Sequence, residues 1–128
     1  MDEESILDTI KIALGVGPDD TAFDTEIMLH LNSAFSTLRQ IGAAPELGFY
    51  IKDKEATWLD FYGPANPLQE IKTYLVLRVK LLFDPPTTGY YMEAVKEQIK
   101  ELEWRLNSEQ WVFNPSVYIR EEVIPNDE

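Results

Sequence analysis

The segment that most constrains this chain's fold runs from Asn66 to Pro85 and reads NPLQEIKTYLVLRVKLLFDP. Asn66 is suited to the N-cap of a helix, and Pro67 to the first helical position, where a missing N–H costs nothing. Pro85 and Pro86 then end the helix, because proline excludes the helical conformation for the residue before it. These signals predict a long helix between Asn66 and Pro85.

The apolar residues of this segment form two stripes when placed at 100° per residue. The first stripe contains Leu68, Ile71, Leu75, Val79 and Leu82, and the second contains Tyr74, Leu77 and Leu81. A surface helix needs only one apolar face, so we expect a central helix, or one that also packs against a neighbour. The alternation over 77–81 also permits a strand, which the length and the capping signals disfavour.

Composition limits the chain to one acidic domain of 128 residues with a formal net charge of −12. This charge argues against a duplex-DNA grip, which needs a basic patch. The sequence contains no cysteine, which excludes disulfides and thiolate metal sites. The acidic beginning, MDEES, does not resemble a signal peptide, and no apolar run is long enough to cross a membrane.

Three further helices are predicted around the central one. Ser5 caps the first, with Asp8 in a weak capping box, and Gly15 ends it. The second begins with a cap at Asp24 or Thr25 and continues through Ile41, and the fourth runs from about Tyr90 to Leu106. The carboxylates of 19–24 are better explained by the dipole of the second helix than by a metal site.

Residues 43–65 differ in character, with turn residues and dense aromatics. They predict a small hairpin, or a loop followed by one helical turn. The aromatics either form a binding surface or cover the end of the helical core, and the second interpretation is favoured. These are Phe49, Tyr50, Trp58, Phe61 and Tyr62.

The last residues, 108–128, are predicted to be an extended tail that follows a helical domain of residues 1–107. A flexible tail is normally polar, whereas this one is apolar and aromatic, so we expect it to dock on its own core or on another chain. The predicted docking residues are Trp111, Val112, Phe113, Val117, Tyr118 and Ile119. The predicted fold class is therefore mainly α: a small four-helix bundle with a short β-like or loop insertion between helices 2 and 3 and an extended C-terminal tail.

Catalytic and cofactor motifs are missing from the sequence. It has no Gly-rich phosphate loop and no zinc motif, and His30 is its single histidine. Carboxylate pairs are plentiful, but no spacing singles out the pair that a hydrolase would need. We expect no enzyme activity, no cofactor and no metal. An acidic DNA mimic that inhibits a nucleic-acid-binding enzyme is the alternative function, although the carboxylates are scattered.

Two stretches carry a resemblance to a known family. Phe-Asp-Pro-Pro at 83–86 and Leu-Glu-Trp-Arg-Leu-Asn at 102–107, with Gly-Val-Gly-Pro-Asp-Asp at 15–20, resemble the head–tail connector (adaptor) proteins of tailed bacteriophages. The resemblance implies a structural virion protein, made in the host cytoplasm, that forms a ring, usually of twelve copies, at the neck. It implies contacts with the portal protein and with a stopper or tail-completion protein, around a DNA channel without tight binding.

The resemblance also implies a role for the second apolar stripe. The rest of the sequence offers no obvious cover for Tyr74, Leu77 and Leu81, and Arg105 could pair with a carboxylate at a subunit contact. A ring needs side-to-side contacts between copies. We therefore predict that these four residues lie at a subunit interface.

Overall fold

The computed structural model describes residues 4–44, 48–62 and 68–113. Within these ranges the chain is helical and has no strand, with one isolated bridge between Ser5 and Thr57. The helices are α1 (Ile6–Leu14), α2 (Asp24–Gln40), α3 (Trp58–Tyr62), α4 (Leu68–Phe83) and α5 (Gly89–Phe113). The mainly helical fold class is thus confirmed.

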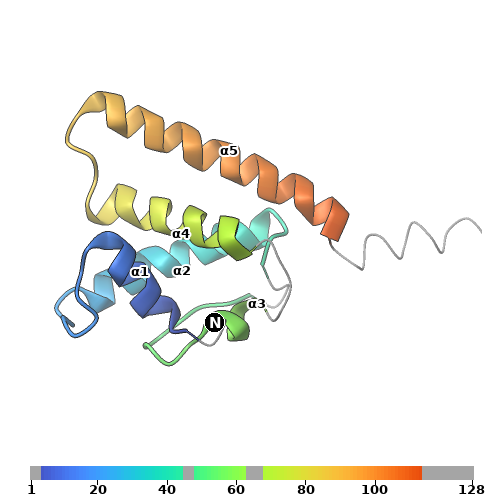
Figure 1. The fold of residues 1–128 in the computed structure, drawn as a ribbon. Helices are drawn as coiled ribbons and strands as arrows, with labels where there is room; N and C mark the ends of the chain where they lie inside the picture. Colours follow the sequence, from blue (N-terminus) through green and yellow to red (C-terminus); the bar gives the residue numbers. More distant parts are fainter. Residues whose placement is uncertain (1–3, 45–47, 63–67, 114–128) are drawn as a thin grey trace, which may run out of the picture.

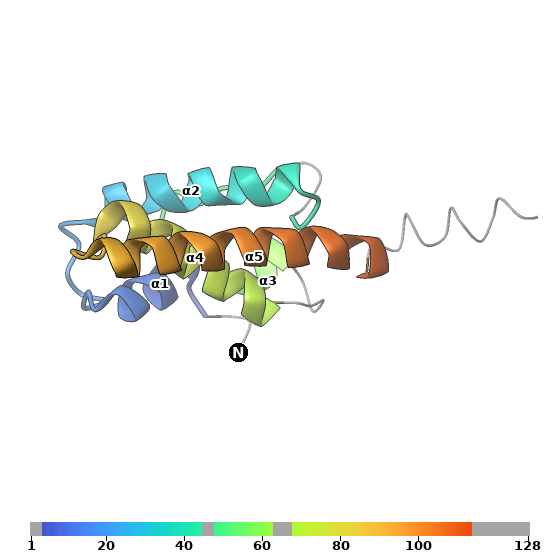
Figure 2. The same cartoon turned by 90° about the horizontal axis from the view of Figure 1, so that it is seen from above.

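Helix α4 is the central element of the fold, as its two stripes predict. It packs against α2, α5 and α1. Figure 1 shows α4 as a middle layer, with α1 and α2 on one side and α5 running antiparallel to it on the other. Seen from above in Figure 2, α5 crosses over α4 at an angle. A helix between two layers must be apolar on two sides, which explains its composition.

Both stripes of α4 enter the core, but not in full. Ile71, Tyr74, Leu75 and Val79 are buried, whereas Leu82 is mostly exposed. The expectation that Leu82 completes the buried stripe is therefore wrong. The last turn of α4 packs instead through Phe83, whose ring lies edge-on to Phe23, with the centroids 5.4 Å apart. The rest of the core comes from the other helices and the insertion: Ile6, Leu7, Ile10, Ile27, Leu31, Ala34, Phe35, Leu38, Ala43, Ile51, Trp58, Phe61, Ile99, Leu102 and Leu106.

The helix ends follow the predicted signals in α1 but not in α2. The Ser5 hydroxyl accepts a bond from the Asp8 amide at 3.2 Å, and Gly15 ends α1 with φ of 85°, a conformation that favours glycine. For α2 the N-cap position is Phe23, which makes no side-chain capping bond. The predicted cap at Asp24 or Thr25 is therefore wrong, since Asp24 lies in the first turn of the helix.

The insertion between α2 and α4 forms a loop and one helical turn, α3, rather than a hairpin. Thr57 and Asp60 cap this turn reciprocally: the Thr57 amide donates to Asp60 Oδ2 at 3.0 Å, and the Asp60 amide donates to Thr57 Oγ1 at 3.2 Å. Trp58 is buried, and its indole N–H donates to Thr9 Oγ1 of α1 at 3.1 Å. Trp58 and Phe61 thus cover the core, as the favoured interpretation predicts.

Helix α5 is longer than the sequence predicts. It continues beyond Leu106 to Phe113, so residues 108–113 are helical and the expectation of an extended tail from 108 is wrong there. Trp111, Val112 and Phe113 belong to its last turns. Val117, Tyr118 and Ile119 lie outside the described residues, as do Asn66 and Pro67.

Candidate assembly surface

The α4–α5 contact is where most of the predicted interface residues lie. Ile99, Leu102 and Leu106 of α5 are buried against the rest of the chain, while most other described side chains of α5 are exposed. This narrow apolar seam attaches α5 mainly to α4. Polar groups beside the seam add directional contacts.

Tyr74 lies at the centre of one polar cluster. Its side chain is 0% exposed, and its hydroxyl donates to Glu103 Oε2 of α5 at 2.7 Å. Arg78 Nη1 donates to the same hydroxyl at 2.7 Å. Burial, followed by the hydrogen bond to Glu103, raises the pKa of Tyr74 well above its ordinary value. The neutral phenol therefore links α4 to α5.

Arg105 lies in a second polar cluster, two residues after Glu103 on α5. Its Nη1 is 3.3 Å from Glu70 Oε2 in the first turn of α4. Among the described residues, Arg105 Nε and Glu70 Oε1 are buried without a hydrogen-bond partner, so the pair does not form two parallel bonds. Arg105 does pair with a carboxylate, and this carboxylate belongs to the same chain.

The second stripe is covered within the chain to different extents. Tyr74 is fully covered, so the expectation that it lacks cover is wrong, whereas Leu77 and Leu81 are half-buried against the core. The reason is α5, which packs against α4 and places Glu103 over Tyr74. The assignment of Tyr74, Leu77, Leu81 and Arg105 to a subunit interface stays a prediction.

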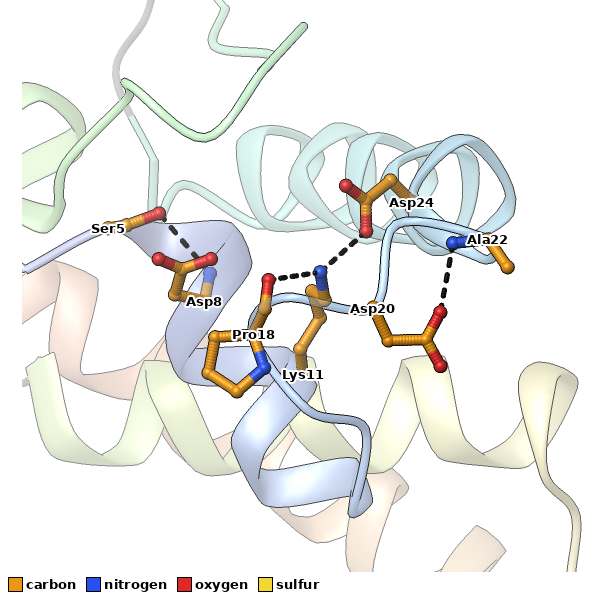
Figure 3. Close-up of polar contacts among 7 residues, drawn as sticks. All are labelled: Ser5, Asp8, Lys11, Pro18, Asp20, Ala22 and Asp24. Atoms are coloured by element: carbon orange, nitrogen blue, oxygen red, sulfur yellow. Dashed lines mark hydrogen bonds and ion pairs between the residues drawn. The ribbon is translucent and has the colours of Figure 1, made fainter.

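A buried lysine is the feature that sequence reasoning missed. Lys11 is 1% exposed; its Nζ donates to the Pro18 carbonyl at 3.0 Å and lies 2.8 Å from Asp24 Oδ1. Figure 3 shows the ammonium between the α1–α2 loop and the start of α2. Leu7 and Leu14 flank Lys11 at helical spacing, a pattern that indicated an inward-facing position. Lys11 thus binds both the acidic loop and the first turn of α2. The charge of the Asp24 carboxylate is therefore paired with a lysine of the same chain.

Comparison with known proteins identifies the chain. Residues 6–111 match the family model described as phage connector protein. The chain belongs to the phage connector protein family. No curated protein and no solved structure matches it.

The family assignment fits the chemistry of this phage connector. The family is structural, and its members act at the head–tail junction of the virion, in contact with other head and tail proteins. Residues 6–111 include Phe-Asp-Pro-Pro and Leu-Glu-Trp-Arg-Leu-Asn, the stretches on which the resemblance rested. In the described part of the connector, no group of three potential metal ligands occurs, and no helix could cross a membrane.

The connector exposes apolar side chains on both outer layers of the fold. Around the α4–α5 turn, Leu82, Tyr90 and Tyr91 are exposed, with 81% of Tyr90 open to solvent. Further along α5, Trp104 is 70% exposed, and Ile12 is exposed on α1. Large exposed aromatics are typical of protein contact surfaces.

Exposed carboxylates on α5 alternate with lysines rather than forming a negative row. Lys96 lies 3.8 Å from Glu93, and Lys100 lies 3.9 Å from Glu97. A DNA mimic would need carboxylates at phosphate spacing without neutralising cations. The α5 surface of the connector therefore argues against the DNA-mimic alternative.

Proposed function

We propose that this connector assembles with copies of itself into a ring at the head–tail interface, between the portal protein and the next connector or tail protein. The family match over residues 6–111 carries the proposal. A role of this kind depends on surfaces rather than on a reaction, so it requires no catalytic group. The resemblance implies twelve copies.

A closed ring requires two different surfaces on each copy, because each subunit contacts its neighbours head to tail. The exposed apolar residues supply two candidates on opposite sides of α4. One is the α5 side, with Tyr90, Tyr91 and Trp104, and the other is the α1 side, with Ile12. Leu77 and Leu81, half-buried along α4, would extend the first surface. Tyr74 and Arg105 would act there by holding α5 in place.

The charge of the chain suits a channel through which DNA passes without tight binding. The net charge of −12 makes contact with phosphates unfavourable, and a ring would multiply this charge around its lumen. We propose that unpaired carboxylates of each copy face the channel. DNA would then move past the ring without the counterion release that drives binding.

The C-terminal residues are proposed to attach the ring to its neighbour. Residues 114–128 contain Val117, Tyr118 and Ile119 directly after the last described residue of α5. Trp111, Val112 and Phe113 would extend this docking segment onto the helix end. An apolar segment that follows a rigid helix suits the capture of a neighbouring protein.

Reconstitution on isolated portal rings tests this proposal. The purified chain is mixed with portal rings, and sedimentation and negative-stain images measure how many copies bind. We expect several copies per portal and an added ring of density. Removal of residues 114–128 should weaken binding while the circular dichroism of the helices stays unchanged.

A variant pair separates assembly from folding. Tyr90→Glu changes a side chain that is 81% exposed on the proposed contact surface, so we expect fewer copies per portal without a change in unfolding midpoint. Leu29→Glu, on the exposed face of α2, is the matched control and should bind as the native chain does. Portal binding that is undetectable for the native chain, or unaffected by Tyr90→Glu, would contradict the proposed ring contact.

A further inference from the structure

A pocket of about 350 Å³ lies between α2 and the segment that follows it, apart from the surfaces discussed above. Asn32, Phe35 and Arg39 of α2 line it on one side, and Gly48, Phe49 and Tyr50 line it on the other. This volume is at the small end of the range for ligand sites, and it suits one or two side chains of a peptide.

The pocket walls are held in place by specific contacts. The Asn32 side chain binds the backbone of Ile51 twice: its amide donates to the carbonyl at 2.9 Å, and its oxygen accepts from the N–H at 2.8 Å. Phe49 packs edge-on against Phe35, with ring centroids 5.1 Å apart. The segment 48–51 is thus fixed to α2, and the pocket is a formed feature rather than a gap between loops.

Glycine at position 48 also contributes to the shape of the pocket. Gly48 has φ of +88°, which disfavours other residues, and a Cβ there would lie 3.7 Å from Arg39 Cδ and Nε. The arginine stem therefore lies against the glycine and forms part of the rim.

The chemistry of the pocket favours an aromatic or aliphatic side chain next to acidic residues. Phe35 and Phe49 supply an apolar floor, and Tyr50 stands at the rim with 69% of its surface exposed. Arg39 lines the same pocket, and Lys52 follows the Tyr50–Ile51 pair at the exposed surface. An apolar residue would occupy the floor while carboxylates beside it face these cations.

We propose that, before assembly, this pocket holds the chain's own C-terminal segment, with Tyr118 in the aromatic floor and Glu121 and Glu122 near Arg39 and Lys52. The sequence from Val117 to Glu122 reads VYIREE, which has the required order of apolar and acidic residues. Residues 114–128 contain four acidic residues and a single arginine, so their charge complements the rim.

The place where α5 ends favours the same chain as the source of the segment that fills the pocket. Helix α5 ends at the same end of the molecule as the C-terminal half of α2, which carries the pocket (Figures 1 and 2). Tyr118 lies five residues after Phe113, the last described residue, and five extended residues span up to about 17 Å. Attachment to the same chain gives an effective concentration in the millimolar range, so even a weak site is occupied.

This occupancy would keep the docking residues away from other proteins until a partner takes them. The partner must compete with the pocket, so assembly would begin only on a surface that binds the segment more tightly. The inference goes beyond the proposed ring and does not depend on it, because it concerns the free chain.

A spin-label experiment on the full-length chain tests the proposal. The sequence contains no cysteine, so Ser116→Cys provides a single attachment point for a nitroxide. We expect at least a fivefold loss of amide signal at Gly48 and Tyr50 of the same chain, and little loss at Leu29. Tyr118→Ala in the labelled chain should restore most of the signal.

Two arms complete the test. Chains that carry the nitroxide but no ¹⁵N are mixed with ¹⁵N chains that carry no nitroxide. Signal loss at the pocket in that mixture would show binding between chains and would overturn the proposal that the segment occupies the pocket of its own chain. Tyr50→Ala should restore the signal at Gly48, whereas the matched control Tyr90→Ala, outside the pocket, should not. Signal loss confined to other surfaces, or none at Gly48, would overturn the proposal.

Discussion

The buried lysine of α1 allows the sharpest prediction about stability. In Lys11→Met the chain loses the bond donated to the Pro18 carbonyl, and a hydrogen bond from a charged donor contributes about 1.5–3 kcal/mol. Methionine retains an apolar stem of similar length, so the loss of packing is small. Asp24 also loses its cation at Oδ1, an atom that is buried without a hydrogen-bond partner, which adds to the cost. We expect Lys11→Met to lower the free energy of unfolding by about 2–4 kcal/mol.

Removal of the partner carboxylate should lower the free energy of unfolding by more. In Asp24→Ala the Lys11 ammonium, 1% exposed, retains only the Pro18 carbonyl. Loss of one partner from a buried ion pair costs about 3–5 kcal/mol. In the double variant no buried charge is left unpaired, so its cost should fall below the sum of the two single costs by about 1–3 kcal/mol.

Urea unfolding followed by tryptophan fluorescence and circular dichroism measures all three variants. Lys96→Met, on the exposed face of α5, is the matched control and should change stability by less than about 0.5 kcal/mol. The reasoning is refuted if Lys11→Met is as stable as the native chain, or if the two single costs simply add.

Three further variants probe other contacts. Tyr74→Phe removes the hydroxyl between Glu103 and Arg78 and should cost about 1–2 kcal/mol near neutral pH, measured by urea unfolding. The pKa of Tyr74 is raised in the fold, so its contribution is complete below pH 10 and falls as the pH rises above that, because the unfolded chain loses the phenolic proton first. Tyr74→Phe should lack this part of the alkaline decline, and an identical decline would contradict the assignment. Ser5→Ala removes the cap of α1 and should cost about 1 kcal/mol, with a lower thermal midpoint as the readout. Leu75→Glu places a charge at a fully buried position and should prevent cooperative thermal unfolding, whereas Leu82→Glu should leave it intact.

The sequence predicted the helices well because each depends on local signals. Ser5 and Gly15 define α1 by capping chemistry, and the two stripes of α4 required a central position. The start of α2 was predicted less well, because the carboxylate of Asp24 binds Lys11, a residue 13 positions earlier, rather than a neighbouring amide. A contact between distant residues leaves no periodic signal.

The candidate surface was harder to predict, since it depends on which faces other elements cover. Tyr74 lies in an apolar stripe whose cover could come from α5 or from a neighbouring copy, and the sequence alone does not choose between them. The packing of α5 against α4 decides the question, because it places Glu103 over Tyr74. Likewise, the sequence did not show which aromatics around Phe49 enter the core and which line the pocket. The Asn32–Ile51 bonds, which no pattern predicted, hold this segment against α2.

Electron cryomicroscopy of purified virions tests the central claim most directly. The account predicts that the chain can be traced at the neck as a ring between the portal and the tail, with α1 and α5 of adjacent copies on the contact surfaces. Virions in which the neck contains no density for this chain, and whose protein content lacks it by mass spectrometry, would contradict its proposed role as a connector of the assembled particle.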